Sequence, residues 1–380
     1  MTLSKSNQTR PSRADFTSAV QSAEPQHIPP TRPNDPSNNL KRSDPFQFGS
    51  RYLEQGDDVF EFNAWDHVQP DEEWKAYAEA QIAKQREAPA TEYDRYRFNK
   101  EPAKWWNLFY KNNTANFFKN RKWLRQEFPV LAEVTQPDAG KQIVLEVGAG
   151  AGNTAFPLLA NNQNEGLMVH ACDFSKTAVQ VMRDSEEYNP KHIVADVWDV
   201  SAEGDDSLPP GLTEGSVDVV ILIFIFSALS PAEWGGALRN IYRVLKPGGK
   251  VLFRDYGRGD LAQVRFKKGK YLGENFYVRG DGTRVYFFDE NELRQMWTEW
   301  TPEKGIPTPV EKKQQEDTRY TPEQPAAKGK GNVFDIEHLG VDRRLIVNRQ
   351  SKLKMHRCWI QGLFRKHDVP STDGEQKSES

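Results

Sequence analysis

The sequence predicts a doubly wound α/β domain with a mostly parallel central sheet. Short runs of apolar, β-branched residues recur along the middle of the chain, and stretches with helical spacing separate them. This alternation is typical of parallel sheets that are covered by helices on both faces. The first of these runs ends in a glycine-rich turn, so we expect a ligand site at the carboxyl edge of the sheet.

The segment IVLEVGAGAG contains that turn. Gly148, Gly150 and Gly152 allow the backbone to approach a ligand closely. A dinucleotide fingerprint requires a further glycine where the chain has Asn153. Glu146 places a carboxylate at the strand end, where a cation is preferable to a pyrophosphate. We therefore favour S-adenosylmethionine, a sulfonium with an amino group, and keep a purely structural turn as the alternative.

Two further strands end in acids. The run at 167–172 is followed by Asp173, and the run at 192–195 is followed by Asp196. An acid after the second strand can accept hydrogen bonds from both ribose hydroxyls, and an acid after the third strand can accept one from the adenine amino group. The alternatives are that Asp173 only caps the helix that begins near Ser175 and that Asp196 is a solvated turn residue.

The later segments continue the alternation. A DG turn at Asp281-Gly282 separates apolar stretches. In chain order we expect a strand at 217–226, a helix at 231–245, a strand at 250–254, and antiparallel partners at 275–288 and 340–348.

Composition limits the class of protein. The chain has 380 residues and a net charge of −3, so a nucleic-acid site must come from local clusters of cations. Cys172 and Cys358 give no basis for a metal site or a disulfide framework, and no apolar run reaches the roughly 20 residues of a membrane span. We expect a cytoplasmic protein. A mitochondrial presequence is the minor alternative, because the first thirteen residues are basic and contain no acid.

Cations and aromatic residues cluster in three segments, 93–125, 254–271 and 343–366. In the first, Lys and Arg alternate with Trp, Phe and Tyr. That pattern suits a single-stranded nucleic acid, whose phosphates meet cations and whose bases stack on rings. The alternative is an amphipathic helical cap that buries its aromatic face, with ordinary solvated charges elsewhere.

Several segments together resemble one known family. The residues are FNAWDHV at 62–68, WNLFYKNNTANFFKNRKWL at 106–124, LEVGAGAGNTAFPLL at 145–159, the block from RDYG to RVYFF at 254–288, and VDRRLIVNR at 341–349. From Phe48 to about Lys366 the chain is similar to the tRNA 3-methylcytidine methyltransferases. FNAWDHV resembles the branch that acts on threonine tRNA.

The resemblance implies a class I S-adenosylmethionine-dependent methyltransferase with a seven-stranded sheet. It also implies the formation of 3-methylcytidine at position 32 of the anticodon loop, with tRNA as partner. An accessory protein for tRNA selection is a further candidate partner, which the sequence leaves open. The expected organisation is a disordered tail at 1–45, a helical tRNA-binding extension at 46–135, a methyltransferase domain at 136–366 with a low-complexity insert at 301–332, and a disordered tail at 367–380.

The resemblance also implies a cofactor pocket. The matching positions are Tyr110, Arg121, Gly148, Asp173, Asp196, Val197 and Ile223. Glu146 at the strand end and Gly150 in the glycine turn complete this set. Tyr110 and Arg121 have RNA contact as an alternative role.

The chemistry itself demands little acid–base catalysis, because cytosine N3 carries an in-plane lone pair at neutral pH. Asp255 is the candidate for stabilising the cationic product ring, with a contact to Arg254 or to a loop backbone as its alternative role. Phe226 and Ser227 are expected to shape the base pocket. The expected phosphate contacts are Arg254, Arg258, Arg343, Arg344 and Arg349. A methyltransferase for a small molecule or a protein, and a non-catalytic RNA-binding scaffold, remain as alternative functions.

Overall fold

The computed structural model describes residues 51, 53, 55–204, 207–302, 305–306 and 333–367. All of them belong to one compact unit, Asn39–Ser380, while the other unit, Met1–Asn38, contains none of them. The tails predicted for 1–45 and 367–380, except for His367, lie outside the described residues. Most of the insert predicted at 301–332 lies outside them as well.

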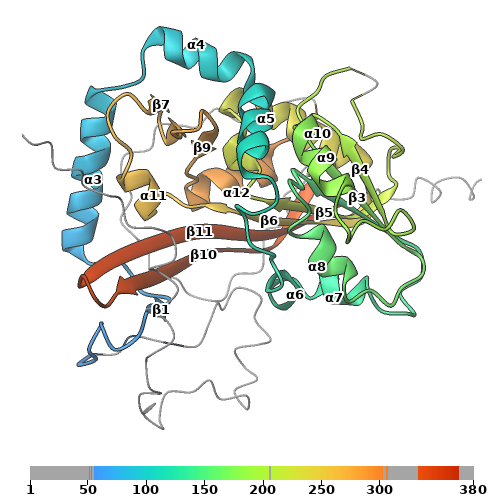
Figure 1. Cartoon of the computed structure of the whole chain (residues 1–380), viewed down its shortest axis with the longest axis horizontal. Coiled ribbons are helices and arrows are strands. Elements are labelled where there is room, and N and C mark those ends of the chain that lie inside the picture. Colours follow the sequence, from blue (N-terminus) through green and yellow to red (C-terminus); the bar gives the residue numbers. More distant parts are fainter. Residues whose placement is uncertain are drawn as a thin grey trace, which may run out of the picture. The chain divides into compact units, whose positions relative to one another are not determined.

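The described residues form one large sheet of eight strands, in the order β1-β10-β11-β6-β5-β2-β3-β4. The strands from β6 to β4 are parallel neighbours, and β11, β10 and β1 add antiparallel pairs at one side (Figure 1). The bounds are β1 Ala64–Asp66, β2 Gln142–Val147, β3 Leu167–Asp173, β4 Ile193–Val197, β5 Val217–Ile223, β6 Leu245–Tyr256, β10 Phe334–Asn348 and β11 Leu353–Lys366.

This arrangement is the class I methyltransferase fold, with one strand more than expected. The additional strand, β1, comes from the N-terminal extension and pairs with residues 344–346, near the carboxyl end of β10. Its centre, Trp65, is fully buried against Leu345 and Val347, and its indole nitrogen donates to the carbonyl of Val59 at 2.8 Å. Three residues are too few to produce a strand pattern, so only this packing reveals the eighth strand.

Antiparallel pairing is present in the later segments, but the two predicted partners lie in different sheets. The DG turn joins β8 Phe276–Val278 to β9 Arg284–Tyr286, and β7 Tyr271–Gly273 completes a separate three-stranded sheet. Residues 340–348 pair with β11 and β1 instead. Alternation in a sequence identifies a strand but not the strand beside it.

Hydrophobic cores cover both faces of the main sheet, which confirms the doubly wound class. On β5, Val220 and Leu222 face one core while Val219 and Ile221 face the other. The first core is covered by α10 Trp234–Val244 and α12 Glu290–Glu299. The second is covered by α6 Leu124–Glu127, α7 Val130–Glu133, α8 Ala155–Leu159 and α9 Lys176–Arg183.

The strand predicted at 217–226 ends earlier, at Ile223. The chain then turns through Phe224, which has a positive φ of 62°, into the short 3₁₀ helix η1 Phe226–Ala228. The helix predicted at 231–245 is split into a 3₁₀ turn, η2 Pro231–Glu233, and α10. Continuous apolar character cannot mark such a break in direction, since buried strand and buried turn share it.

The extension contains α3 Glu72–Glu87, α4 Glu92–Lys100 and α5 Pro102–Asn113. These helices arch over the small sheet toward the main sheet (Figure 1). Asp71 and Thr91 accept backbone N–H groups at the starts of α3 and α4, as N-caps do. Gln85 of α3 donates to the carbonyl of Gln263 at the end of α11 Leu261–Val264, and α5 packs on α9. None of the helices in the described ranges is long and apolar enough to cross a membrane.

Candidate active site

Side chains from other parts of the chain pack directly against the glycine turn after β2. Gly148 and Gly150 have φ values of 65° and 61°. A Cβ atom at Gly148 would meet Ile225 Cδ1 at 1.7 Å, and one at Gly150 would meet the Tyr110 hydroxyl at 2.3 Å. Only glycine therefore fits these two positions, and Tyr110 of α5 closes over the turn.

Glu146 is the deepest charged group of the site. Its side chain is 2% exposed, and its Oε2 atom has no hydrogen-bond partner among the described residues. Burial raises the pKa of Glu146 to about 7, although Arg121, whose Nη1 lies 3.9 Å from Glu146 Oε1, opposes the shift. Arg121 also donates to Thr154 Oγ1 at 2.9 Å. A buried carboxylate oxygen without a donor is a binding position for an amino group.

Asp173 links the glycine turn to the next helix. One carboxylate oxygen accepts the Gly150 N–H and the other accepts the Ser175 N–H, both at 2.8 Å. Burial raises the pKa of Asp173 to about 6. The local role that sequence reasoning kept as an alternative is therefore present, although the helix N-cap itself is Ser175. The ribose contact stays a prediction.

Asp196 and Val197 end β4 on the same edge of the sheet. Arg183 of α9 donates to Asp196 Oδ1 at 2.8 Å, so this acid is held in place and is not a free turn residue. Val197 is half exposed, which is unusual for a valine at a strand end. Ile223 is buried at the end of β5. The side chains thus lie on successive strands of the carboxyl edge, as the sequence predicts.

Sequence reasoning missed an aromatic pair beside this edge. The rings of Phe224 and Tyr256, which follow β5 and end β6, lie 4.9 Å apart, and the Arg121 guanidinium lies 5.9 Å from the Phe224 ring. Phe224 takes a backbone conformation that is rare for a bulky residue. The position directly after a strand end was the only signal available.

Three predicted catalytic residues are buried away from solvent, and their roles are corrected accordingly. Asp255 is 0% exposed, and its two oxygens accept the N–H groups of Ser227 and Tyr256 at 2.9 and 2.8 Å. Burial raises the pKa of Asp255 to about 6. The Phe226 ring packs in the core against Phe253 and Trp297. In this structure Asp255, Ser227 and Phe226 therefore support the loop that carries Phe224, and the contact with a loop backbone that was the alternative role of Asp255 is present.

Arg254 is likewise corrected, from a phosphate contact to a buried structural cation. It is 4% exposed. Its Nη2 donates to Asp342 at 2.7 Å, its Nη1 donates to Gln361 at 2.9 Å, and its guanidinium lies 5.1 Å from both the Trp123 and Trp359 rings. Glu127, whose pKa burial raises to about 7, lies beside this cluster.

The other predicted RNA contacts remain accessible to different degrees. Arg349 is exposed in the turn after β10, and Arg343 and Arg344 are half-buried on β10. Arg344 lies 3.4 Å from Asp66 of β1, and Arg258 pairs with Glu79 of α3 at 3.2 Å.

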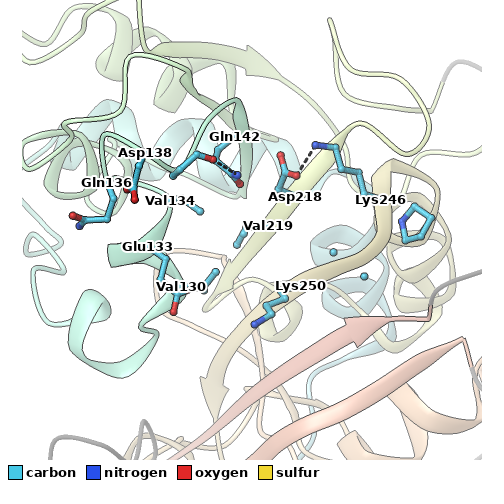
Figure 2. A pocket seen from close by; sticks show the side chains of 14 residues that line it. Val130, Glu133, Val134, Gln136, Asp138, Gln142, Asp218, Val219, Lys246 and Lys250 are labelled. Atoms are coloured by element: carbon cyan, nitrogen blue, oxygen red, sulfur yellow. Dashed lines mark hydrogen bonds and ion pairs between the residues drawn. The ribbon is translucent and has the colours of Figure 1, made fainter.

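A cavity of about 580 Å³ lies at the opposite edge of the sheet. Figure 2 shows Gln142, Asp218, Lys246 and Lys250 around it, from the starts of β2, β5 and β6, with Asp218 paired to Lys246. Since it lies at the amino ends of the strands, this cavity is not part of the site formed at their carboxyl ends.

Comparison with known proteins places the chain among tRNA-modifying enzymes. A methyltransferase domain family matches residues 145–251. The tRNA N(3)-methylcytidine methyltransferase trm140 of Schizosaccharomyces pombe is 44% identical over 84% of this chain and 92% of its own length. The Drosophila melanogaster enzyme Mettl2 is 42% identical over 86% of this chain and 90% of its own length. The chain belongs to the tRNA N(3)-methylcytidine methyltransferase family.

A further relative is the tRNA(Thr) (cytosine(32)-N(3))-methyltransferase of Saccharomyces cerevisiae, 46% identical over 87% of this chain. The chain spans only 47% of that relative's length. Family membership agrees with the S-adenosylmethionine site, because the buried Glu146 oxygen without a donor suits the donor's cationic amino group.

Proposed function

We propose that the protein transfers the methyl group of S-adenosylmethionine to N3 of cytidine 32 in the anticodon loop of threonine tRNA. The observation that carries the proposal is the carboxyl edge of the sheet, where an unpaired buried carboxylate oxygen, a glycine turn and an aromatic pair converge. The names of the relatives support the choice of tRNA, nucleoside and position.

On the donor side, Glu146, Asp173 and Asp196 contact different parts of S-adenosylmethionine in this proposal. Glu146 Oε2 accepts from the donor's amino group beside the glycine turn. Asp173 and Asp196 remain in reach of ribose and adenine. The donor supplies an electrophilic methyl on sulfur, so the protein's contribution is alignment, which is worth about 7–11 kcal/mol in favourable cases.

On the acceptor side, Phe224 and Tyr256 offer ring faces to the cytosine. N3 lies on the Watson–Crick edge, so the base must leave any stack before it reacts. Methylation makes the ring cationic, and aromatic faces attract cations. In this proposal Phe224 and Tyr256 therefore both orient the base and stabilise the charge that develops during transfer.

The test is methylation of unfractionated tRNA from a strain that lacks the modification. Purified protein and labelled S-adenosylmethionine should yield 3-methylcytidine on nucleoside analysis, and the label should map to position 32 of threonine tRNA. Glu146→Gln keeps the shape but removes the charge, and Asp196→Ala removes the adenine contact, so both should abolish the product. Asp138→Ala, at an exposed position beside the cavity at the opposite edge of the sheet, is the control and should keep full activity.

Methyl transfer to protein or to small molecules, but not to tRNA, would refute the proposed substrate. Tight RNA binding without S-adenosylmethionine binding would instead indicate an RNA-binding scaffold. The proposal includes action in the cytoplasm and an accessory protein for tRNA selection. Addition of cell extract to an inactive purified protein would reveal such a requirement.

A further inference from the structure

A second cavity, of about 370 Å³, lies between the extension and the turn of the small sheet. Arg97 and Phe98 of α4, Trp105 and Leu108 of α5, and residues 280–282 of the β8–β9 turn are among its walls. Leu108 is 44% exposed, so the cavity reaches the surface.

The chemistry of these walls suits an unpaired nucleobase. The Phe98 and Trp105 rings lie 5.0 Å apart, and the Arg97 guanidinium lies 5.2 and 4.9 Å from them. The Trp105 indole N–H is buried and has no acceptor among the described residues. That N–H lies inside the wall and is not open to the cavity, so recognition rests on stacking. A base offers a π face to the lining rings, and its phosphate offers a charge to Arg97, whose Nη1 also lies 4.0 Å from Asp94 Oδ1.

The same two elements that border the cavity also border the active site. On α5, Phe109 lines the cavity, and the next residue, Tyr110, packs its hydroxyl against Gly150 of the glycine turn. On the β8–β9 turn, Arg279 precedes the lining residues and places its guanidinium 5.7 Å from the Tyr256 ring. A nucleotide in the cavity would therefore be a neighbour of the nucleotide that is methylated.

The turn is built to lie against the indole. Gly282 has a φ of 88°, and a Cβ atom there would meet Trp105 Cε3 at 2.2 Å. Glycine thus allows the backbone of the turn to form one wall of the cavity.

We propose that this cavity binds a second unpaired nucleobase of the RNA, next to the cytidine that is methylated. The proposal rests on the proposed RNA substrate and specifies how the loop is held. Two bases held at once fix the direction and register of a single-stranded segment, which one flipped base alone does not.

The experiment measures binding of a threonine-tRNA anticodon stem-loop, intact or with an abasic nucleotide at each loop position in turn. The variant Leu108→Trp fills the cavity from an exposed position, and Asn112→Trp does so one helical turn later. For wild type, one abasic position other than the methylated cytidine should raise Kd about tenfold, the effect of one stacked base.

Both variants should raise Kd for the intact RNA by about the same factor. For each variant, the RNA that is abasic at that position should bind with the same Kd as the intact RNA. S-adenosylmethionine affinity should be unchanged in both, which excludes misfolding as the cause. Asp138→Trp, at an exposed position at the opposite edge of the sheet, is the control and should keep the wild-type pattern.

Additive losses at every loop position would overturn the proposal, since the cavity would then receive no base. Coupling at the methylated cytidine itself would also overturn it, because the cavity would hold the target. If the wild-type enzyme methylates the stem-loop but the cavity variants show no coupling to any abasic position, only the second-base site is refuted. Absence of methylation of the intact RNA, both with purified protein and after addition of cell extract, refutes the proposed function itself.

Discussion

At the scale of single residues, Arg254 shows how a cation in a basic segment can serve the fold. It bridges Asp342, Gln361 and two indole rings inside the protein. Arg254→Met should lower the free energy of unfolding by about 3 kcal/mol, because Asp342 is left buried with a weaker partner. Urea denaturation measures this loss, and Arg349→Met, at an exposed position, should change it by less than about 0.5 kcal/mol.

A phosphate-contacting Arg254 would behave in the opposite way. Its loss would weaken tRNA binding and leave the urea midpoint in place. An unchanged midpoint in Arg254→Met would therefore contradict the structural role.

Glu146 makes donor binding depend on pH. Its pKa, raised to about 7 by burial, means that most of the carboxyl groups are protonated at pH 6. An ammonium group prefers the ionised form, so affinity for S-adenosylmethionine should rise roughly tenfold from pH 6 to pH 7.5. Proton release on binding at pH 6 should accompany this, and calorimetry in buffers of different ionisation enthalpy measures both.

Residue 146 cannot titrate in Glu146→Gln, so the variant's affinity should be weak and should change by no more than about twofold over the same range. Asp173, with a pKa of about 6, is itself half protonated at pH 6 and adds about a twofold change over this range, which the variant shares with wild type. A wild-type affinity that does not change between pH 6 and pH 7.5 would contradict the assignment of Glu146 to the amino group.

At the scale of elements, β1 makes the extension part of the main sheet. Trp65→Ala should lower the free energy of unfolding by about 3 kcal/mol or more, because a fully buried indole in contact with Leu345 and Val347 is lost. The effect should be local. Hydrogen exchange should quicken in β1 and in 341–348 of β10, while β2 and β5 keep their protection.

Leu353→Ala, on the exposed start of β11, is the control and should leave both exchange and stability nearly unchanged. Equal loss of protection throughout the main sheet would mean that β1 belongs to the global folding unit and is not a local addition.

Elements differ in how well the sequence predicts them, for physical reasons. The turn after β2 is set by local backbone demands, so its glycines and Glu146 can be recognised from a few residues. The eighth strand depends on β10, which lies far along the chain from Trp65. Its three residues carry no periodic pattern, so only tertiary packing identifies it.

The candidate site divides in the same way. Asp173 and Asp196 follow directly from strand ends, and the structure places both on the expected edge. Arg254 and Asp255 are adjacent in a conspicuous motif, but their partners, Asp342 and the Ser227 backbone, are known only from the folded chain. Sequence thus predicts which edge is functional better than which side chains face the substrate.

At the scale of the whole molecule, a chain with a net charge of −3 binds a polyanion only through its local clusters. In the proposed function, the exposed Arg349 at the end of the β10–β11 hairpin contacts a tRNA phosphate, whereas the buried Arg254 contacts none. A plot of log K against log salt has a negative slope, and each phosphate contact to a single strand that is lost should make that slope less steep by roughly 0.7. Arg349→Ala should show that decrease for threonine tRNA, measured from 50 to 200 mM salt. Arg254→Met should bind with the wild-type slope under conditions where it is folded, and an unchanged slope in Arg349→Ala would remove the hairpin end from the tRNA interface.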